Sequence, residues 1–458
     1  MEAASNERPN ILVVIVDDLG VHQLGCHGST FSETPNIDSL ARQGVRFKCA
    51  YSASPICSPG RAAIYTGIHP ARLHLTNYIP GTEPENPRLL TPPWRAYLPV
   101  EVETIGDVLK AAGYATGHFG KWHLAPDYHY APGRPMDPES QGFDTVTFTR
   151  KPMADANPED DPHHVEQITG DAIRFMSGVR DRPFLCMVAH NALHRPEMAP
   201  AALVEKYARK PGQRLKSNRP VVAAMMEEVD HSVGRLVEYI DSAGNARDTF
   251  VIFTSDHGAF GPSGERKPLR GAKADLYEGG IRVPLIVRWP GRIAPGERET
   301  PVFGTDLFPT LLEICGLGCD SPCEGVSLAG AVLDANREPP DRGEFCWHFP
   351  HYHHLGLAPC GAIRAGRWKL IEWFERTLAG TDDGPPYELF DLENDPGESH
   401  DLSAGMPELC AELAARLDAW RKRVGAQEMK PNPRYNPGDI AHAVSPPPKG
   451  DPGNPFGE

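Results

Sequence analysis

A continuous run of six apolar residues, 11–16, restricts the fold more than any other feature of the sequence. It reads Ile-Leu-Val-Val-Ile-Val and is mostly β-branched, as strands tend to be. A strand that is apolar at every position is buried on both faces, which is typical of a parallel sheet covered by helices. Similar runs at 184–189 and 249–254 alternate with helical patterns. The sequence therefore predicts an α/β fold with a large, mainly parallel (mixed) sheet sandwiched by helices.

The predicted elements divide the chain into two folded parts and a tail. Helices are expected at residues 34–42, 104–112, 165–177, 221–242 and 305–314, with a further strand at 114–119. After residue 340, short strands at 361–364, 368–373 and 387–391 and a helix at 407–424 predict a smaller antiparallel sheet with one packed helix. We therefore expect an α/β domain at 1–340, an α+β subdomain at 341–430, and a Pro/Gly-rich tail at 431–458 that is an extended arm or disordered.

Charge and hydropathy exclude two classes of partner. The 458 residues include 46 Lys and Arg against 61 Asp and Glu, a formal charge of −15, which argues against nucleic-acid binding. The six-residue apolar run is too short to cross a bilayer, which takes about 20 residues, and we expect no membrane association.

Residues 1–9 are polar and do not resemble a signal peptide. We expect a cytoplasmic protein, or a periplasmic or secreted one if a leader has been removed. Ten cysteines are too few for a chain of 458 residues to be a disulfide-based scaffold.

Two of the predicted strands run directly into acidic residues. Asp17 and Asp18 follow the strand at 11–16, and Asp256 and His257 follow the strand at 249–254. Because ligands of open α/β sheets bind at the carboxyl ends of the strands, these side chains can converge there. Clustered carboxylates repel one another and need a cation; oxygen ligands favour Ca²⁺ or Mg²⁺, and the histidine nitrogen also admits Mn²⁺. Alternatively, Asp18 or Asp256 caps the turn that follows.

Cys57 stands just before a predicted helix. Pro59 suits a first helical turn, and a group at residue 57 would lie at the positive end of that helix, where anions are favoured. Arg61, one turn further on, adds a fixed positive charge. This pattern favours a thiolate nucleophile of low pKa, although a lone cysteine in another context is more often a buried structural residue.

The same segment resembles the signature of a known enzyme family. Cys57-x-Pro59-x-Arg61, followed by Ala-Ala-x-x-Thr-Gly, is similar to the motif of the formylglycine-dependent (type I) sulfatases of the alkaline phosphatase superfamily. The resemblance extends from about residue 10 to 402, with matching segments in order at residues 9–18, 120–124, 192–196, 253–258, 270–273, 277–284 and 388–392. It implies an alkaline-phosphatase-like fold and the hydrolysis of a sulfate ester.

The resemblance also implies roles for single residues. In this family the cysteine corresponding to Cys57 is oxidised to formylglycine by a formylglycine-generating enzyme. The implied metal ligands are Asp17, Asp18, Asp256, His257 and the modified Cys57. Arg61 would stabilise the formylglycine hydrate, Lys121 and Lys273 would hold sulfate oxygens, His123 would help to break down the sulfated intermediate, and His194 would bind sulfate or protonate the leaving alcohol. Two positions depart from the common pattern: Gly60, where Ser or Ala is usual, and His257, where many members have Asn.

The substrate is less restricted by the sequence. Residues 347–354 contain four histidines. One interpretation is a carbohydrate subsite, in which the substrate is contacted by His348, His351, His353 and His354. The alternative interpretation is an aromatic core strand. The chain resembles the bacterial carbohydrate sulfatases, which favours a sulfated sugar. Two other functions stay open: a phosphonate or phosphodiester hydrolase on the same scaffold, and a non-catalytic protein that binds sulfated glycans. The oligomeric state is not predicted.

Overall fold

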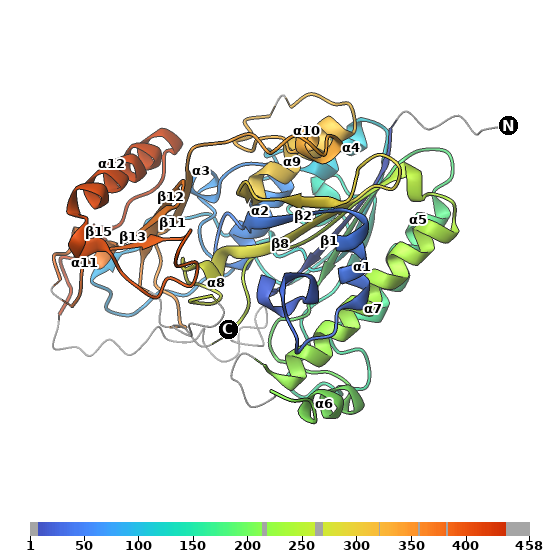
Figure 1. Ribbon diagram of the computed structural model, residues 1–458, viewed down its shortest axis with the longest axis horizontal. Helices are drawn as coiled ribbons and strands as arrows, with labels where there is room; N and C mark the ends of the chain where they lie inside the picture. Colours follow the sequence, from blue (N-terminus) through green and yellow to red (C-terminus); the bar gives the residue numbers. More distant parts are fainter. Residues whose placement is uncertain are drawn as a thin grey trace.

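The computed structural model describes residues 8–212, 218–261, 269–319, 321–355, 358–381 and 383–436 (Figure 1). Among these residues, a central sheet of nine strands has the order β10-β2-β8-β7-β1-β6-β4-β5, with β9 paired to β2. Its strands are β1 (Asn10–Val16), β2 (Val45–Tyr51), β4 (Ala115–Gly120), β5 (Thr145–Phe148), β6 (Phe184–His190), β7 (Thr249–Ser255), β8 (Arg282–Arg288), β9 (Gly296–Arg298) and β10 (Val302–Phe303). β8 runs antiparallel to both of its neighbours, and the other pairings are parallel.

The first strand lies at the centre of this sheet. β1 pairs in parallel with β6 on one side and β7 on the other, and the side chains of residues 11–16 are at most 1% exposed. Its alternate residues enter two different apolar cores, one on each face of the sheet. The continuous apolar run is thus explained by burial on both faces, as the sequence analysis predicted.

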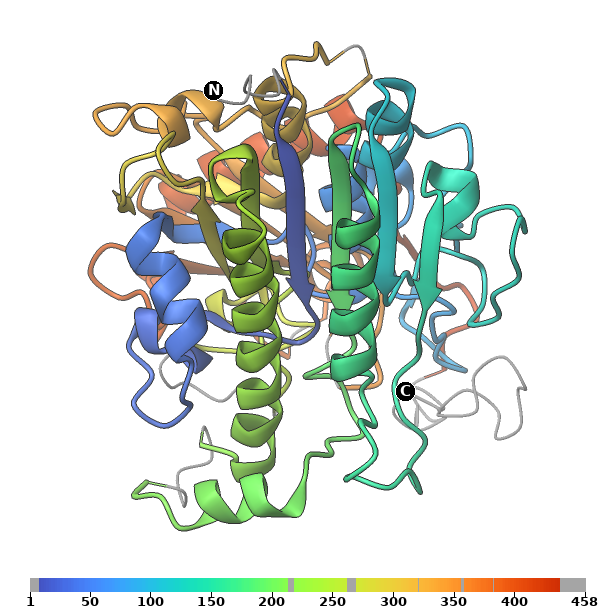
Figure 2. The ribbon, with the colours of Figure 1, turned by 90° about the vertical axis from the view of Figure 1, so that its right-hand side faces the viewer.

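Helices cover both faces. α1, α5 and α7 pack on one face with Leu12, Val14 and Val16, and Figure 2 shows the two long green helices, α5 and α7, in front of the sheet. α2, α4, α9 and α10 pack on the other face. The helices are α1 (Pro35–Gln43), α2 (Cys57–Thr66), α3 (Pro70–Leu73), α4 (Ile105–Ala111), α5 (Val165–Gly178), α6 (Ala201–Ala208), α7 (Pro220–Ser242), α8 (Glu278–Ile281), α9 (Leu307–Ile314), α10 (Ala329–Leu333), α11 (Phe374–Leu378) and α12 (Pro407–Val424).

A second, antiparallel sheet follows the main one. It has the order β11-β12-β13-β14, and α12 packs on one face of it at the end of the molecule opposite α5 and α7 (Figure 1). Its strands are β11 (Phe345–Phe349), β12 (Cys360–Ala365), β13 (Trp368–Trp373) and β14 (Tyr387–Asp391). The predicted fold class, a helix-covered mixed sheet with a smaller C-terminal antiparallel sheet, is confirmed.

The chain after α12 returns to the main domain. β15 (Lys430–Pro431) pairs with β3 (Leu89–Leu90), and the Asn432 amide donates to the carbonyl of Arg88. Residues 431–436 of the predicted tail therefore lie along this segment, and residues 437–458 lie outside the described residues. Among the helices described, none has the length and apolar character needed to span a membrane.

Candidate active site

The carboxyl ends of four parallel strands meet at one edge of the central sheet. Val16 of β1 pairs with His190 of β6 and with Ser255 of β7, and Gly120 of β4 pairs with Ala189. The residues that follow these strands must therefore lie beside one another. They are Asp17 and Asp18 after β1, Lys121 after β4, Asn191 and His194 after β6, and Asp256 and His257 after β7.

Cys57 reaches this edge as the first residue of α2. All ten residues of this helix are buried, and its N-terminal end faces the strand ends, so its dipole favours negative charge there. Cys57 Sγ lies 3.1 Å from His257 Nε2 and 3.4 Å from Asp17 Oδ1. The helix also approaches the backbone closely, because a Cβ at Gly60 would lie 2.3 Å from the Asp256 carbonyl oxygen. The glycine that departs from the common motif thus lets α2 contact the loop after β7.

The buried acids form a cluster suited to a cation. Asp17, Cys57, Asp256 and His257 offer ligand atoms that all lie within 4.8 Å of one another, and Asp18 shares a second such group with Asp17 and Cys57. Both carboxylate oxygens of Asp18 and Oδ1 of Asp256 are buried without a hydrogen-bond partner among the described residues. Buried carboxylate oxygens of this kind need a compensating charge, and a set of hard oxygen donors with one imidazole fits a divalent metal ion.

The ring of His257 is oriented so that Nε2, the nitrogen a metal would bind, faces the acids. Its Nδ1 lies 2.9 Å from the carbonyl oxygen of Gly258, which can only accept, so Nδ1 carries the hydrogen. Nε2 faces the acids, 3.2 Å from Asp18 Oδ1, where it holds a proton without a cation and offers its lone pair once a cation replaces that proton. Burial lowers the pKa of His257, but Asp256, the Cys57 thiolate and Asp18 outweigh burial and raise this pKa to about 10. The cluster thus attracts positive charge strongly.

Three cationic side chains surround the acids. Lys121 Nζ donates to Asp17 Oδ2 at 2.6 Å, and Arg61 Nε donates to Asp256 Oδ2 at 2.8 Å. Lys273 Nζ lies 3.2 Å from Asp18 Oδ1. Burial raises the pKa of Asp17, yet Lys121, His194, Arg61 and Lys273 together hold it well below its ordinary value. These side chains keep the Asp17 carboxylate ionised.

The same charges act on the Cys57 thiol. Burial and the charge of Asp17 raise its pKa, but Lys121, Lys273 and His257 lower it by more, and the resulting pKa is about 7. The environment at residue 57 therefore stabilises a negatively charged atom, whether that atom is sulfur or oxygen.

His123 and His194 stand at the rim of the cluster. His123 Nε2 donates to the Ile79 carbonyl at 2.7 Å, and its ring stacks on Tyr128 with the centroids 5.4 Å apart. His194 Nε2 lies 3.0 Å from Lys273 Nζ. The backbone of His123 is left-handed at φ +59°, as is that of Asp18 at +60°. Such strain in non-glycine residues is concentrated at functional sites.

A pocket opens beside these residues. Lys121, His123 and His194 line it together with residues that the sequence analysis did not single out: Trp122, Ala125, Asp127, Tyr128, Phe148, Thr149, Arg150, Lys151 and Asn191. Thr149 and Asn191 directly follow β5 and β6, so their position at the end of a strand was the signal available. In the sequence, acids at the ends of strands stand out, whereas uncharged polar residues in the same places do not.

The structure separates the four histidines predicted to contact substrate. His348 and His351 are interior residues: His348 Nε2 donates to the carbonyl of Gln427, and His351 Nε2 bonds with Thr76 Oγ1. Their assignment to a substrate subsite is therefore corrected: His348 belongs to β11, the buried aromatic strand of the alternative interpretation, and His351 follows it in the interior. The rings of His353 and His354 lie 5.3 Å and 6.0 Å from that of Tyr78, close to the segment that carries Ile79.

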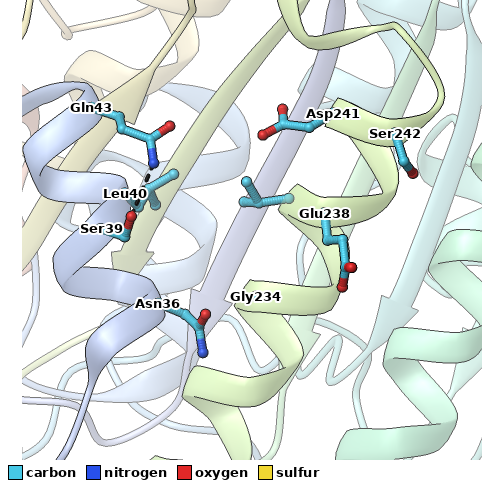
Figure 3. A pocket seen from close by; sticks show the side chains of 9 residues that line it. Asn36, Ser39, Leu40, Gln43, Gly234, Glu238, Asp241 and Ser242 are labelled. Carbon is cyan, nitrogen blue, oxygen red and sulfur yellow. Dashed lines mark hydrogen bonds between the residues drawn. The ribbon is translucent and has the colours of Figure 1, made fainter.

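A second groove lies far from this chemistry. It runs between α1 and α7 and is lined by residues such as Asn36, Gln43 and Glu238 (Figure 3). None of the predicted catalytic or metal-binding residues lines it.

The chain is similar to known proteins over most of its length. A family profile described as sulfatase matches residues 9–317, about two-thirds of the chain, and one described as N-sulphoglucosamine sulphohydrolase, C-terminal, matches residues 272–423. Human arylsulfatase A is 29% identical over 89% of this chain and 86% of its own length. The N-acetylgalactosamine-6-O-sulfatase of Bacteroides thetaiotaomicron is 26% identical over 92% and 94%. The crystal structure of Ps i-CgsB in complex with k-i-k-neocarrahexaose has a TM-score of 0.74 and 26% identity, covering 90% of this chain and 93% of that one.

Proposed function

This chain belongs to the sulfatase family and is a sulfuric ester hydrolase, and from that premise we propose that its substrate is an O-sulfated saccharide. We further propose that Cys57 is converted to formylglycine by a formylglycine-generating enzyme, and that the acid cluster binds Ca²⁺, with Mg²⁺ or Mn²⁺ as alternatives. The observation that carries the proposal is the position of Cys57, whose Sγ lies between Asp17 and His257 at the positive end of a buried helix.

The donor set assigns the residues that would hold the cation. These are Asp17, Asp18, Asp256, His257 and residue 57. When bound, a divalent cation neutralises the acids and polarises an ester oxygen, and the formylglycine hydrate supplies an oxygen nucleophile together with a second hydroxyl group. Arg61, bonded to Asp256 and to the carbonyl of Lys121, fixes the two sides of the site relative to each other and places positive charge beside residue 57.

Lys121 and Lys273 are placed to bind the sulfate oxygens. Each ammonium group contacts one of the acids after β1, so the two cations flank the position of the ester. A sulfate ester gains negative charge on its non-bridging and leaving oxygens as the S–O bond breaks. Fixed donors that meet this charge in a site shielded from water lower the barrier, and removing one typically costs about 10²–10³ in kcat.

His194 is placed to pass a proton to the leaving alcohol. Its Nδ1 lies 2.7 Å from the carbonyl oxygen of Arg195, which accepts, so Nδ1 carries the hydrogen. Nε2 of the neutral ring therefore accepts from the Lys273 ammonium at 3.0 Å. A proton held between these two nitrogens lies beside the sulfate subsite and can move to the alkoxide. His123, fixed by Ile79 and stacked on Tyr128, forms the opposite wall.

The saccharide is supported by the relatives and by the pocket. N-acetylgalactosamine-6-O-sulfatase is named for a sulfated sugar, and the structure of Ps i-CgsB contains a neocarrahexaose. In this chain the pocket beside Lys121 offers the partly exposed ring of Tyr128 together with the polar side chains of Thr149 and Asn191. Aromatic faces with a few polar groups suit a sugar ring.

The test begins with the tryptic peptide of residues 49–61. Protein produced together with a formylglycine-generating enzyme should give this peptide with the mass of the aldehyde instead of the thiol, and should hydrolyse 4-nitrophenyl sulfate faster than the matching phosphonate ester. Cys57→Ala should abolish hydrolysis and keep the fold. Unmodified cysteine under these conditions, or equal rates with Cys57→Ala, would contradict the proposal.

A further inference from the structure

The pocket beside Cys57 continues past the end of β5. Lys121, His123 and His194 line one part of it, and Thr149, Arg150 and Lys151 line another. Arg150 and Lys151 also line the adjoining hollow, which extends to His164. A sugar whose sulfate lies against Lys121 and His194 can therefore extend past Arg150.

The sheet determines where Arg150 lies. Gly120 and Phe148 are paired at the ends of the parallel strands β4 and β5. Lys121 and Arg150 therefore follow neighbouring strands at the same edge of the sheet, one and two residues beyond the pairing. Parallel strands lie about 4.8 Å apart, so the Arg150 backbone is within a sugar ring or two of the proposed sulfate subsite.

Two further contacts hold this segment. Asn191 Nδ2 donates to Thr149 Oγ1 at 2.7 Å, which ties the residue before Arg150 to the end of β6. The Arg150 guanidinium faces the Phe148 ring, with Cζ 5.9 Å from the centroid, and the Phe148 ring stacks on Tyr130 at 5.1 Å and 6°. The side chain is thus supported by an aromatic surface while part of it remains accessible.

No acid in the described part of the chain forms an ion pair with Arg150, whereas the acids nearby are engaged by others. Asp127, in the same pocket, accepts from Arg134 Nη1 at 2.8 Å. In the adjoining hollow, Asp160 accepts from the Asn157 side chain, and Asp161 accepts from a backbone amide. A positioned guanidinium without a carboxylate partner, in the wall of a pocket, is suited to bind an anionic group of a ligand by two parallel hydrogen bonds.

We infer that Arg150 binds a second anionic group of the substrate, a sulfate or a carboxylate, and so selects saccharides that carry one in addition to the sulfate being cleaved. This inference rests on the proposed function and deepens it. Lys151, which shares both hollows, adds positive charge to the same wall.

The test measures competition against hydrolysis of 4-nitrophenyl sulfate, which has no anionic group besides the scissile sulfate. The competitors are N-acetylgalactosamine 6-sulfate, its 4,6-disulfate, and the 6-sulfated disaccharide that carries a uronic acid. For the wild type we expect the last two to inhibit at concentrations about 10- to 100-fold lower than the first. Arg150→Gln should remove most of this preference, and Arg150→Lys, which keeps the charge without the planar fork, should retain part of it.

Arg180→Gln is the matched control, because Arg180 is an exposed arginine in the loop between α5 and β6, at the opposite edge of the sheet. It should leave the preference as in the wild type. Preference for the disulfate alone or for the disaccharide alone would identify the second group as sulfate or carboxylate, and either supports the inference. The inference would be overturned by a wild-type protein that shows no preference among the three competitors, or by an Arg150→Gln variant that keeps the full preference. Absence of sulfate ester hydrolysis would overturn the proposed function, whereas hydrolysis without such a preference would overturn the inference alone. The two failures are therefore distinguishable.

Discussion

Asp18 is the residue whose environment depends most on a cation. Its carboxylate is 1% exposed, and neither oxygen has a hydrogen-bond partner among the described residues, although Lys273 and His257 place nitrogen atoms 3.2 Å from Oδ1. We predict that Asp18→Asn weakens cation binding by at least about 10- to 100-fold, the loss typical when even an outer partner of a metal ligand is removed. The variant keeps the volume of the side chain, so the fold should persist.

The measurement is the melting temperature of chelator-treated protein as CaCl₂ is added. A cation that binds only the folded state adds about 2.7 kcal/mol when its concentration is 100 times its Kd, so the wild type should melt at a higher temperature and Asp18→Asn should respond only at much higher concentration. Asp155→Asn, at an exposed position, serves as the control. If Ca²⁺, Mg²⁺ and Mn²⁺ all leave the wild type unchanged, the acid cluster does not bind a divalent cation.

Helix α2 is the element that places residue 57, and its contact at Gly60 leaves no room for a side chain. A Cβ there would lie 2.3 Å from the Asp256 carbonyl oxygen and 3.1 Å from Ser52 Oγ. We predict that Gly60→Ala lowers the free energy of unfolding by about 1–3 kcal/mol, the usual effect of overpacking, although alanine is the better helix former. The variant should also lose activity, because the displaced carbonyl belongs to a proposed metal ligand.

The matched control is Gly170→Ala in the middle of α5, where an added Cβ meets no atom within 4 Å. There the same substitution should raise the free energy of unfolding by about 0.5–1 kcal/mol. Urea denaturation of both variants gives the comparison. Equal stability of the two variants would show that the backbone of α2 and Asp256 adjusts at no cost.

Other elements show why the sequence predicted some features and not others. The strand at residues 11–16 was predictable because burial on both faces makes it apolar throughout. β8 was not, since Pro284 interrupts its pattern; in the structure, the pairing of β8 with β2 shifts register at this point, so the ladder needs no donor there. The acids at the strand ends were predictable from topology, whereas His348 was misassigned, because its partner is a backbone carbonyl 79 residues away.

At the scale of the whole molecule, buried charges join the two sheets. Lys369 of β13 donates to Glu278 of α8 at 3.0 Å and lies 2.8 Å from Glu398, and all three side chains are fully buried. Glu398 Oε2 accepts from the Glu278 amide, and Tyr51 of β2 donates to Glu278 Oε2. α8 in turn holds the loop after β7, because the Gly258 amide donates to the Gly280 carbonyl. The charge cluster thus connects the C-terminal sheet to the active site.

This cluster should make stability depend on pH in a definite direction. Burial and the charge of Glu278 raise the pKa of Glu398, Lys369 lowers it by less, and the resulting pKa is about 7. The folded state therefore holds this proton more tightly than the unfolded chain, whose glutamates titrate near 4.3. The stabilisation of the folded state by this proton is fully present below about pH 4.3 and is lost as the pH rises through 7. We predict that Glu398→Gln, which mimics the protonated side chain, becomes more stable relative to the wild type between pH 5 and 7.5.

The measurement is urea denaturation of both proteins across this pH range. Glu408→Gln, at an exposed position of α12, controls for the general effect of removing one negative charge. A difference between Glu398→Gln and the wild type that stays constant, or that decreases with pH, would contradict the assignment of a raised pKa to Glu398.

Lys369 offers the strongest test of whether the two sheets unfold together. Lys369→Met would leave the carboxylates of Glu278 and Glu398 buried beside each other without their shared cation, and breaking a buried ion pair in this way costs about 3–5 kcal/mol. Since the cluster joins β13, α8 and β2, the loss should act on both sheets: we predict one unfolding transition at lower urea concentration with an unchanged slope. Lys422→Met, which removes an exposed pair with Asp418, should move the midpoint little.

Adding Glu278→Gln and Glu398→Gln to Lys369→Met should recover much of the lost stability, because three neutral side chains need no compensation. If Lys369→Met instead unfolds in two separate transitions, the C-terminal sheet is an independent unit, and its buried charges do not connect it to the active site. A single transition that shifts in parallel with the loss of sulfatase activity means that α8 transmits the state of the C-terminal sheet to Asp256 and His257. The second sheet is then part of what positions the metal ligands.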